Sequence, residues 1–278
     1  QRYTTATKAT YNPWSFYIIE LALRYENITD FEGAWSPFLA NTILLPKRIK
    51  LHAIVSRNYT IPTLNDLYWS PGGNPLLKPE FGWFKEAAVS KEFAFTKSTI
   101  NLEIRGYEGL MQEWIQWIPT DQGYFAPRNL KEVEVKGVET SLSATRTFNQ
   151  LKLGLIANYS YNQSTNLSEV FVGDNSVGTQ LVFLPFNRGN LSLSADYNKW
   201  LFSMNSNFTG FIYTDGNNTN FLNGYHTENI SLLKSWDFKK AVTSIGLGVN
   251  NLLNTNYQTL PGRPMPGRNY TLNISIKF

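Results

Sequence analysis

Hydrophobic and polar residues alternate with a period of two in almost every segment of this chain. The last ten residues show the pattern most clearly, because polar residues separate Tyr270, Leu272, Ile274, Ile276 and Phe278. Successive side chains of a β-strand point to opposite faces, so the alternation predicts half-buried strands. No stretch approaches the roughly 18 apolar residues that a membrane-spanning helix needs. The chain is therefore expected to be nearly all β.

The apolar faces of two segments carry an aromatic residue at each end. On residues 16–25 this face begins at Tyr17 and ends at Tyr25, and on the last ten residues it begins at Tyr270 and ends at Phe278. Eight residues at about 3.3 Å each span about 26 Å along a strand, or about 20 Å vertically at a tilt of about 40°. This height is close to the lipid-facing band of an outer-membrane barrel, with its two aromatic girdles. We therefore expect a transmembrane antiparallel β-barrel.

Twelve strands are expected, and a partial strand before Asn12-Pro13 would make thirteen. The strands are predicted near residues 16–25, 34–43, 48–57, 81–95, 98–118, 133–147, 151–162, 183–197, 200–213, 225–236, 241–250 and 269–278. Short turns alternate with long loops, which are predicted at residues 26–33, 58–80, 119–132, 163–182, 214–224 and 251–268. The alternation is typical of short periplasmic turns and long extracellular loops. An open sheet would leave unpaired backbone groups in lipid, so the strands are expected to belong to a larger closed barrel.

Several motifs resemble those of the TonB-dependent outer-membrane receptors. Residues 62–69 read PTLNDLYW and residues 72–80 read GGNPLLKPE, a pattern that precedes a barrel strand in that family. Further matches are KGVE at 136–139, NNLLN at 250–254 with Tyr257, and the ending from Pro264 to Phe278. The resemblance covers essentially the whole chain, and it implies a barrel of about 22 strands with a plug inside. Residues 1–278 are then expected to be the C-terminal part of the barrel, without the plug domain and the N-terminal strands.

The resemblance implies active uptake of a scarce ligand, driven through TonB and the plug, with no enzymatic chemistry and no cofactor. The loop motif is most similar to the vitamin B12 and ferric-siderophore receptors of Bacteroidetes, which implies cobalamin or a ferric siderophore as the ligand. Expected partners are outer-membrane lipid, TonB and the ligand, with a surface lipoprotein as a further candidate. A passive porin, a barrel enzyme of the outer membrane and a soluble glycan-binding β protein are the alternatives.

The candidate ligand contacts share a place in or beside the expected extracellular loops. They are Tyr68, Trp69, Asn74, Trp117, Tyr124 and Phe125. For Tyr68 and Trp69 the competing interpretation is packing on the base of the loop. For Trp117, Tyr124 and Phe125, together with Trp114, it is packing in the aromatic girdle. Glu20, Arg24, Glu103 and Arg105 are expected to face the lumen, where they form charge pairs that hold the plug or line the wall. Phe278 is expected to be a girdle aromatic and also, by the resemblance, the assembly signal.

Other kinds of chemistry find little support in the sequence. The two histidines, His52 and His226, each fall on a strand face and are expected to contact lumen water or a neighbouring carboxylate, so no metal site is expected. The chain has no cysteine. Its 25 Lys and Arg residues are scattered and leave a net charge of only +4, so nucleic acid is not an expected partner.

Overall fold

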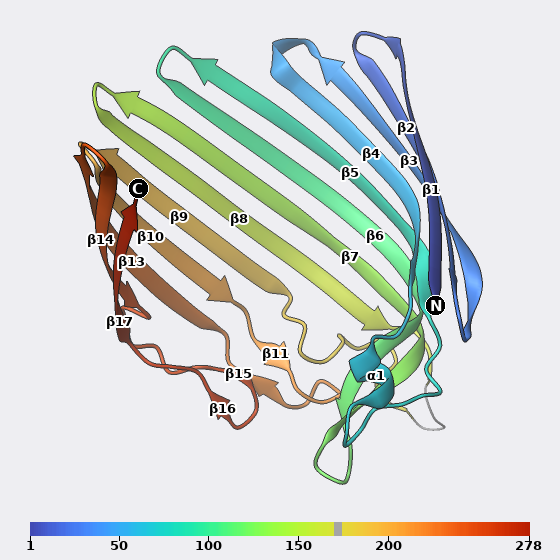
Figure 1. Ribbon diagram of the computed structural model, residues 1–278. Coiled ribbons are helices and arrows are strands. Elements are labelled where there is room, and N and C mark those ends of the chain that lie inside the picture. The colour runs from blue at the N-terminus through green and yellow to red at the C-terminus, as the bar shows by residue number, and fades with distance from the viewer. Residues whose placement is uncertain (170–173) are drawn as a thin grey trace.

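The computed structural model describes residues 1–169 and 174–278, so residues 170–173 of the predicted loop 163–182 lie outside the described part. Thirteen antiparallel strands form one sheet, which curves into an open arc (Figure 1). In sheet order they are β1 (Arg2–Trp14), β2 (Tyr17–Ile28), β3 (Phe31–Leu45), β4 (Ile49–Thr60), β5 (Glu80–Phe95), β6 (Ser98–Pro119), β7 (Phe125–Phe148), β8 (Leu151–Asn166), β9 (Asn187–Tyr197), β10 (Trp200–Thr209), β13 (Tyr225–Phe238), β14 (Ala241–Asn250) and β17 (Asn269–Lys277). The predicted all-β barrel architecture is confirmed for this part of a barrel.

The connections at one end of the sheet contain most of the remaining short elements. These are α1 (Leu64–Tyr68), the hairpin of β11 (Ile212–Tyr213) with β12 (Phe221–Leu222), and the hairpin of β15 (Gln258–Leu260) with β16 (Arg263–Pro264). One short element, η1 (Pro46–Arg48), lies at the other end, in the turn between β3 and β4. Tight turns join the strands at the upper end in Figure 1, which we call the turn end, and the opposite end is the loop end. Among the described residues, no helix is long and apolar enough to span a membrane.

The predicted partial strand near the N-terminus is a full strand. β1 pairs with β2 from Arg2 to Trp14 and continues through Pro13, with a register shift between Tyr11 and Trp14. Proline has no backbone N–H to donate, and it is tolerated here because the pairing with β2 is irregular at this position.

Two predicted long loops are wrong. Residues 26–33 form a tight turn, because β2 runs to Ile28 and β3 begins at Phe31. Most of residues 119–132 belong to the β6–β7 hairpin, because β7 begins at Phe125. Both hairpins continue beyond the apolar band, where lipid no longer imposes the alternation although the backbone hydrogen bonds continue.

Two predicted strand limits also change at the loop end. The segment predicted at 183–197 enters the sheet only at Asn187. The segment predicted at 200–213 leaves the sheet after Thr209, and Ile212 and Tyr213 pair instead with β12 in a separate hairpin.

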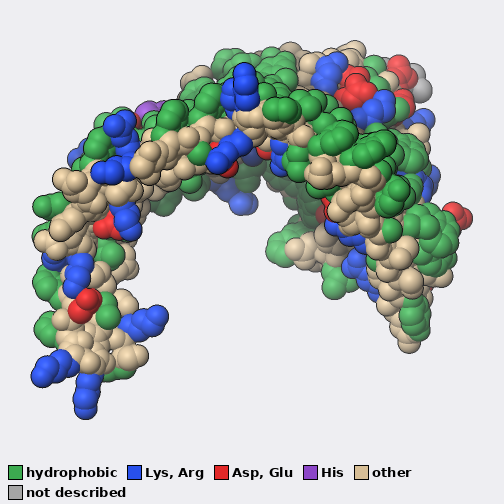
Figure 2. Space-filling model, turned by 90° about the horizontal axis from the view of Figure 1, so that it is seen from above, with side chains coloured by type: hydrophobic (Ala, Val, Ile, Leu, Met, Phe, Trp, Pro, Cys, Tyr) green, Lys and Arg blue, Asp and Glu red, His purple; other side chains and the backbone are tan. Residues whose placement is uncertain are grey.

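The convex face of the sheet is apolar. Leu232, Leu247 and Leu272 are cross-strand partners on this face, and Leu247 and Leu272 are 60% and 61% exposed. Figure 2 shows hydrophobic side chains along the outer rim of the arc and charged side chains on its hollow side. An apolar outer face with a polar inner face is the pattern of a barrel wall in lipid.

Aromatic side chains border the apolar face at both ends. At the loop end, the rings of Tyr25 and Trp35 pack with centroids 4.7 Å apart. At the turn end, the Lys234 ammonium lies 4.9 Å from the centroid of the Trp200 ring. These positions are those of the two girdles that the sequence predicts.

Four charged residues on the convex face mark where the apolar band stops at the loop end. Lys85 pairs with Glu108 at 2.9 Å, and Lys136, the strand partner of Glu108, pairs with Glu134 at 2.6 Å. We call these four residues the charged ladder. Below it, β6 presents Ile104, Leu102 and Ile100 to the same side as Glu108.

The buried core of the described residues lies at the loop end rather than inside the arc. Leu130, Val133 and Leu181 form this cluster, and Trp114 packs against it. A single curved sheet has no second layer to cover its middle, so apolar burial occurs where loops fold over the hairpin tips. Trp114 therefore packs in this cluster and not in the lipid girdle.

Candidate functional site

Helix α1 begins at a capping box in the loop between β4 and β5. The Thr63 hydroxyl accepts a hydrogen bond from the Asp66 N–H at 3.2 Å, and the Asp66 carboxylate accepts one from the Thr63 N–H at 2.7 Å. This reciprocal pair satisfies backbone donors at the start of the helix. It fixes a five-residue helix that would not persist alone.

Trp117 ties this helix to the β6–β7 hairpin. Its Nε1–H donates to the Asp66 Oδ1 atom at 2.7 Å. A hydrogen bond to an ionised acceptor is stronger than one between neutral groups, so one carboxylate serves the helix cap and the contact between the two loops. Trp117 lies in β6 rather than in a loop, and its polar edge is directed at Asp66.

The Gly-Gly-Asn segment after α1 approaches the start of β7. Gly72 has φ +118°, and a Cβ there would lie 2.4 Å from the Phe125 carbonyl oxygen, so only glycine fits. Asn74 Nδ2 donates to the Pro127 carbonyl at 3.3 Å, and Asn74 Oδ1 accepts from the Leu76 N–H at 3.0 Å. Asn74 thus holds the loop in place through both the nitrogen and the oxygen of its side-chain amide.

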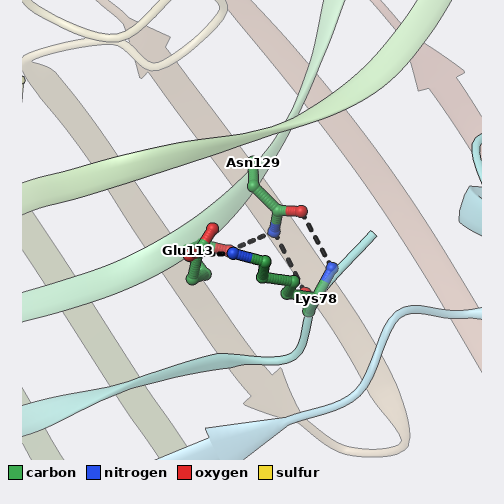
Figure 3. Close-up of polar contacts among 3 residues, drawn as sticks. All are labelled: Lys78, Glu113 and Asn129. Carbon is green, nitrogen blue, oxygen red and sulfur yellow. Dashed lines mark hydrogen bonds and ion pairs between the residues drawn. The ribbon is translucent and has the colours of Figure 1, made fainter. Parts of the chain in front are cut away.

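Asn129 fixes the end of the same loop (Figure 3). Its Oδ1 accepts from the Lys78 N–H at 2.9 Å, and its Nδ2 donates to the Lys78 carbonyl at 3.0 Å and to the Glu113 carbonyl at 2.7 Å. The Lys78 Nζ also lies 3.2 Å from Glu113 Oε1. Glu113 has a positive φ of 55°, which is unusual for a non-glycine residue and marks an irregular point in β6.

Tyr68 and Trp69 are the predicted contacts that point away from this packed region. They are 68% and 57% exposed at the end of α1. Tyr124 lies in the turn between β6 and β7, where its hydroxyl donates to Gln122 Oε1. Phe125 begins β7, and its ring centroid lies 5.7 Å from that of Phe183. Of the six candidates, Tyr68 and Trp69 are the large exposed pair on one short segment.

A cavity of about 310 Å³ lies between the β6–β7 hairpin and two later loops. Its walls combine apolar and polar side chains, among them Ile118, Leu181, Val182, Gln116, Arg128, Gln180 and Asp215. The Thr179 hydroxyl donates to the Gly216 carbonyl at 2.8 Å and joins the two loops beside it. The volume is near the lower limit of ligand pockets, so the cavity can hold one edge of a large ligand.

Asp215 organises the loop on one side of this cavity. Its carboxylate accepts from the N–H groups of Thr219 at 2.9 Å and Asn220 at 3.0 Å, and from the side chains of both residues. Burial alone would raise the pKa of Asp215, but these hydrogen bonds outweigh it and hold the pKa below its ordinary value. The loop therefore presents a fixed, ionised carboxylate at neutral pH.

The predicted lumen charges all lie on the concave face, and all take part in ion pairs. Glu20 pairs with Lys8 at 2.5 Å, and Arg24 pairs with Glu26 at 3.7 Å. Arg105 pairs with Glu103 at 2.8 Å and with Glu86 at 3.4 Å.

The remaining predicted features are Phe278 and the two histidines. Phe278 follows β17 and is 95% exposed. His52 accepts or donates a hydrogen bond with Thr42 at 2.8 Å, and His226 does so with Ser206 at 2.6 Å. Within residues 1–169 and 174–278, no three His, Cys, Asp or Glu side chains are grouped so as to hold a metal ion.

Two positioning residues were missed from the sequence, Asp66 and Asn129. Asp66 had a local signal, because Thr63 and Asp66 have the spacing of a capping box. Asn129 had none, because its main partner, Lys78, lies 51 positions away.

Comparison with known proteins gives one family and a consistent fold. The family model described as TonB dependent receptor-like, beta-barrel, matches residues 6–252. The vitamin B12 transporter BtuB of Photobacterium profundum is 25% identical over 244 residues, which are 86% of this chain and 37% of the relative. A second BtuB, from Vibrio vulnificus, is 30% identical over 92 residues, or 33% of this chain and 14% of the relative.

Solved structures share the fold at low identity. The ferric preacinetobactin receptor BauA of Acinetobacter baumannii superposes with a TM-score of 0.72 at 15% identity, over 100% of this chain and 43% of BauA. The ferric enterobactin receptor PfeA of Pseudomonas aeruginosa gives 0.73 at 18% identity, over 98% of this chain and 44% of PfeA. The chain thus spans less than half the length of these relatives.

Proposed function

The chain belongs to the TonB-dependent receptor-like β-barrel family, and on that basis we propose that it forms part of a receptor for TonB-dependent uptake of a scarce ligand. Family membership also places it in the bacterial outer membrane, which it crosses with its strands, and in a class of receptors and transporters rather than enzymes. We propose that residues 1–278 are the C-terminal part of the barrel, and that the plug and the other strands belong to the rest of the receptor.

One observation carries this proposal: a barrel wall with an apolar outside ends in loops that are folded on one another. The hydrogen bonds of Asp66, Asn74 and Asn129 hold the loop 61–79 against the β6–β7 hairpin. A passive porin does not need a fixed loop surface, whereas a receptor binds its ligand more tightly when the loops that contact it are already ordered. The exposed Tyr68 and Trp69 lie on that surface.

Cobalamin is the ligand we propose first, and a ferric siderophore second. The long sequence match to a vitamin B12 transporter supports cobalamin, and the likeness to siderophore receptors is one of fold. Origin in Bacteroidetes stays a prediction from the loop motif, and a surface lipoprotein partner also stays a prediction.

Uptake by whole cells tests the proposal. The full-length receptor is expressed in cells that lack their own receptors, and uptake of radiolabelled cyanocobalamin and of ferric enterobactin is measured with and without TonB. We expect energised uptake of one probe that disappears without TonB. Uptake that persists without TonB would identify a passive porin instead.

Ligand contact by α1 has its own test. Tyr68→Ala and Trp69→Ala are expected to weaken binding of the transported probe at the cell surface, because a flat aromatic side chain contributes contact area at low entropic cost. Leu76→Ala is the matched control, since Leu76 is 87% exposed in the same loop. Equal losses in all three variants would refute a specific role for the two aromatic residues.

A further inference from the structure

The concave face of the sheet is divided into two sectors of different chemistry. The sector from β1 to β7 carries ion-paired charges, among them Glu20, Glu86 and Arg105. The sector from β8 to β17 presents mainly amides, hydroxyls and glycines along the middle of its strands, with Ile156 among its apolar members, and its charges, such as Arg188 and Lys277, lie at the strand ends. The division follows the strand order and is therefore a division around the barrel wall.

One row of cross-strand partners shows the change from charged to neutral side chains. Ser90, Glu103, Ser141, Asn158, Asn190, Asn207 and Thr227 are successive cross-strand partners from β5 to β13. The charge on this row lies on β6, and every member from β7 onward is uncharged. We call the inner side of β8, β9, β10 and β13 the amide wall, with Asn158, Asn190, Ser192, Asn205 and Asn207 as its central residues.

The polar groups of the amide wall are only partly occupied by one another. Asn190 Nδ2 donates to Asn207 Oδ1 at 2.9 Å, and the Ser192 hydroxyl donates to Asn205 Oδ1 at 2.7 Å. A primary amide has two donors and two acceptor sites, so these bonds leave capacity directed at the lumen. Asn158 is exposed on the concave face.

In the charged sector, the polar groups are already engaged in ion pairs with one another. Arg105 is engaged by two carboxylates, and a solute that displaced one of them would leave a charge without its partner. Transit through a pore requires contacts that are favourable enough to enter and weak enough to leave. Neutral hydrogen-bonding groups meet this condition, because a solute exchanges bonds with them as it does with water.

We propose that the amide wall is the side of the lumen along which the transported solute passes, and that it suits an uncharged solute rich in amide and hydroxyl groups. This inference rests on the proposed uptake function and adds the route of the solute inside the barrel. The charged sector is then the side that the solute does not follow.

Single cysteines on the shared register row test the route, in a chain that has no native cysteine. Asn158→Cys lies on the amide wall, and Ser90→Cys is the matched control on the same row in the charged sector. Each full-length variant is treated with a bulky, membrane-impermeant thiol reagent, and the labelled fraction, surface binding and uptake of cyanocobalamin are measured. Ser192→Cys is a second amide-wall variant in case Asn158→Cys does not assemble.

The proposal expects labelling of Asn158→Cys to remove most cyanocobalamin uptake and to spare surface binding, while labelled Ser90→Cys keeps its uptake. If only the amide-wall cysteine is labelled, a loss of uptake in that variant still supports the proposal, because the side open to water is then also the side that the solute needs. Equal loss of uptake at both positions, loss at Ser90→Cys only, or an unlabelled amide wall would overturn it. If the unmodified receptor takes up no probe, the proposed function fails; if it does and the reagent has no effect, only the route fails.

Discussion

Leu155 and Ile156 are neighbours in β8 that face opposite sides of the barrel wall. Leu155 lies on the convex face beside Ala144 and Leu193, whereas Ile156 lies on the concave face beside Ser143 and Ser192 and is 49% exposed. Both carry a branched alkyl side chain, so replacement of each by lysine makes a nearly identical change at adjacent positions. Leu155→Lys puts the charge in lipid, and Ile156→Lys puts it in the lumen.

The depth of Leu155 sets the expected cost. It is four residues from Leu151, near the turn-end girdle, and four from Tyr159, near the loop-end girdle. Four residues are about 13 Å along the strand, or about 10 Å vertically at a tilt of about 40°, which places Leu155 near the bilayer centre. A lysine there costs about 2–4 kcal/mol, a decrease of about 30- to 1,000-fold in the folded-to-unfolded ratio. Ile156→Lys is expected to change stability by no more than about 0.5 kcal/mol.

Reversible folding of the full-length receptor into lipid vesicles in urea or guanidinium measures both free energies. Heat-modified migration on a gel reports the folded fraction. A cost for Ile156→Lys that equals or exceeds the cost for Leu155→Lys would refute the assignment of the two faces. It would mean that a protein interior, and not lipid, covers the convex side.

Three further results are expected. Tyr17→Phe should cost about 1–3 kcal/mol by removing the 2.6 Å hydrogen bond to Asn41 on the apolar face, and the double variant with Asn41→Leu should recover most of the loss in the same folding assay. Trp117→Phe should weaken the anchoring of α1 by about 1.5–3 kcal/mol, seen as faster proteolysis of residues 61–79; an unchanged rate would contradict this. Because the pKa of Asp215 is lowered by folding, the order of its loop should be complete above the ordinary pKa of an aspartate and be lost as the pH falls through the lower folded value. Hydrogen exchange of the loop amides checks this, and Asp215→Asn should abolish the dependence.

The sequence predicts the membrane part of the fold because lipid and water impose the alternation there. The faces of β2 and β17 follow directly from the order of their apolar and polar residues, with Tyr25 and Tyr270 at the limits. Above the apolar band this constraint ends. Residues from Phe125 to Glu132 belong to the strand that pairs with β6, with no alternation to reveal them, so the hairpin was mistaken for a loop.

Candidate contacts were predictable as a region but not in their roles. The motif around Tyr68 and Trp69 indicated an ordered loop, and the structure leaves both side chains exposed. Trp117 and Asn74 belong to the same region, yet their side chains hold the loop together through Asp66 and Pro127. Such roles depend on partners more than fifty positions away, which a local pattern does not contain.

The charged ladder limits how deep the receptor can sit. If the barrel moved inward by a single residue pair, Lys85, Glu108, Lys136 and Glu134 would together approach the hydrocarbon, each at a cost that grows with depth. At the turn end the depth is less strictly fixed, because the ammonium of Lys234 can extend along the Trp200 ring toward the headgroups. A thicker bilayer would therefore be accommodated at the turn end, by local thinning of the bilayer or by further extension of Lys234, while the loop end kept its height above the lipid.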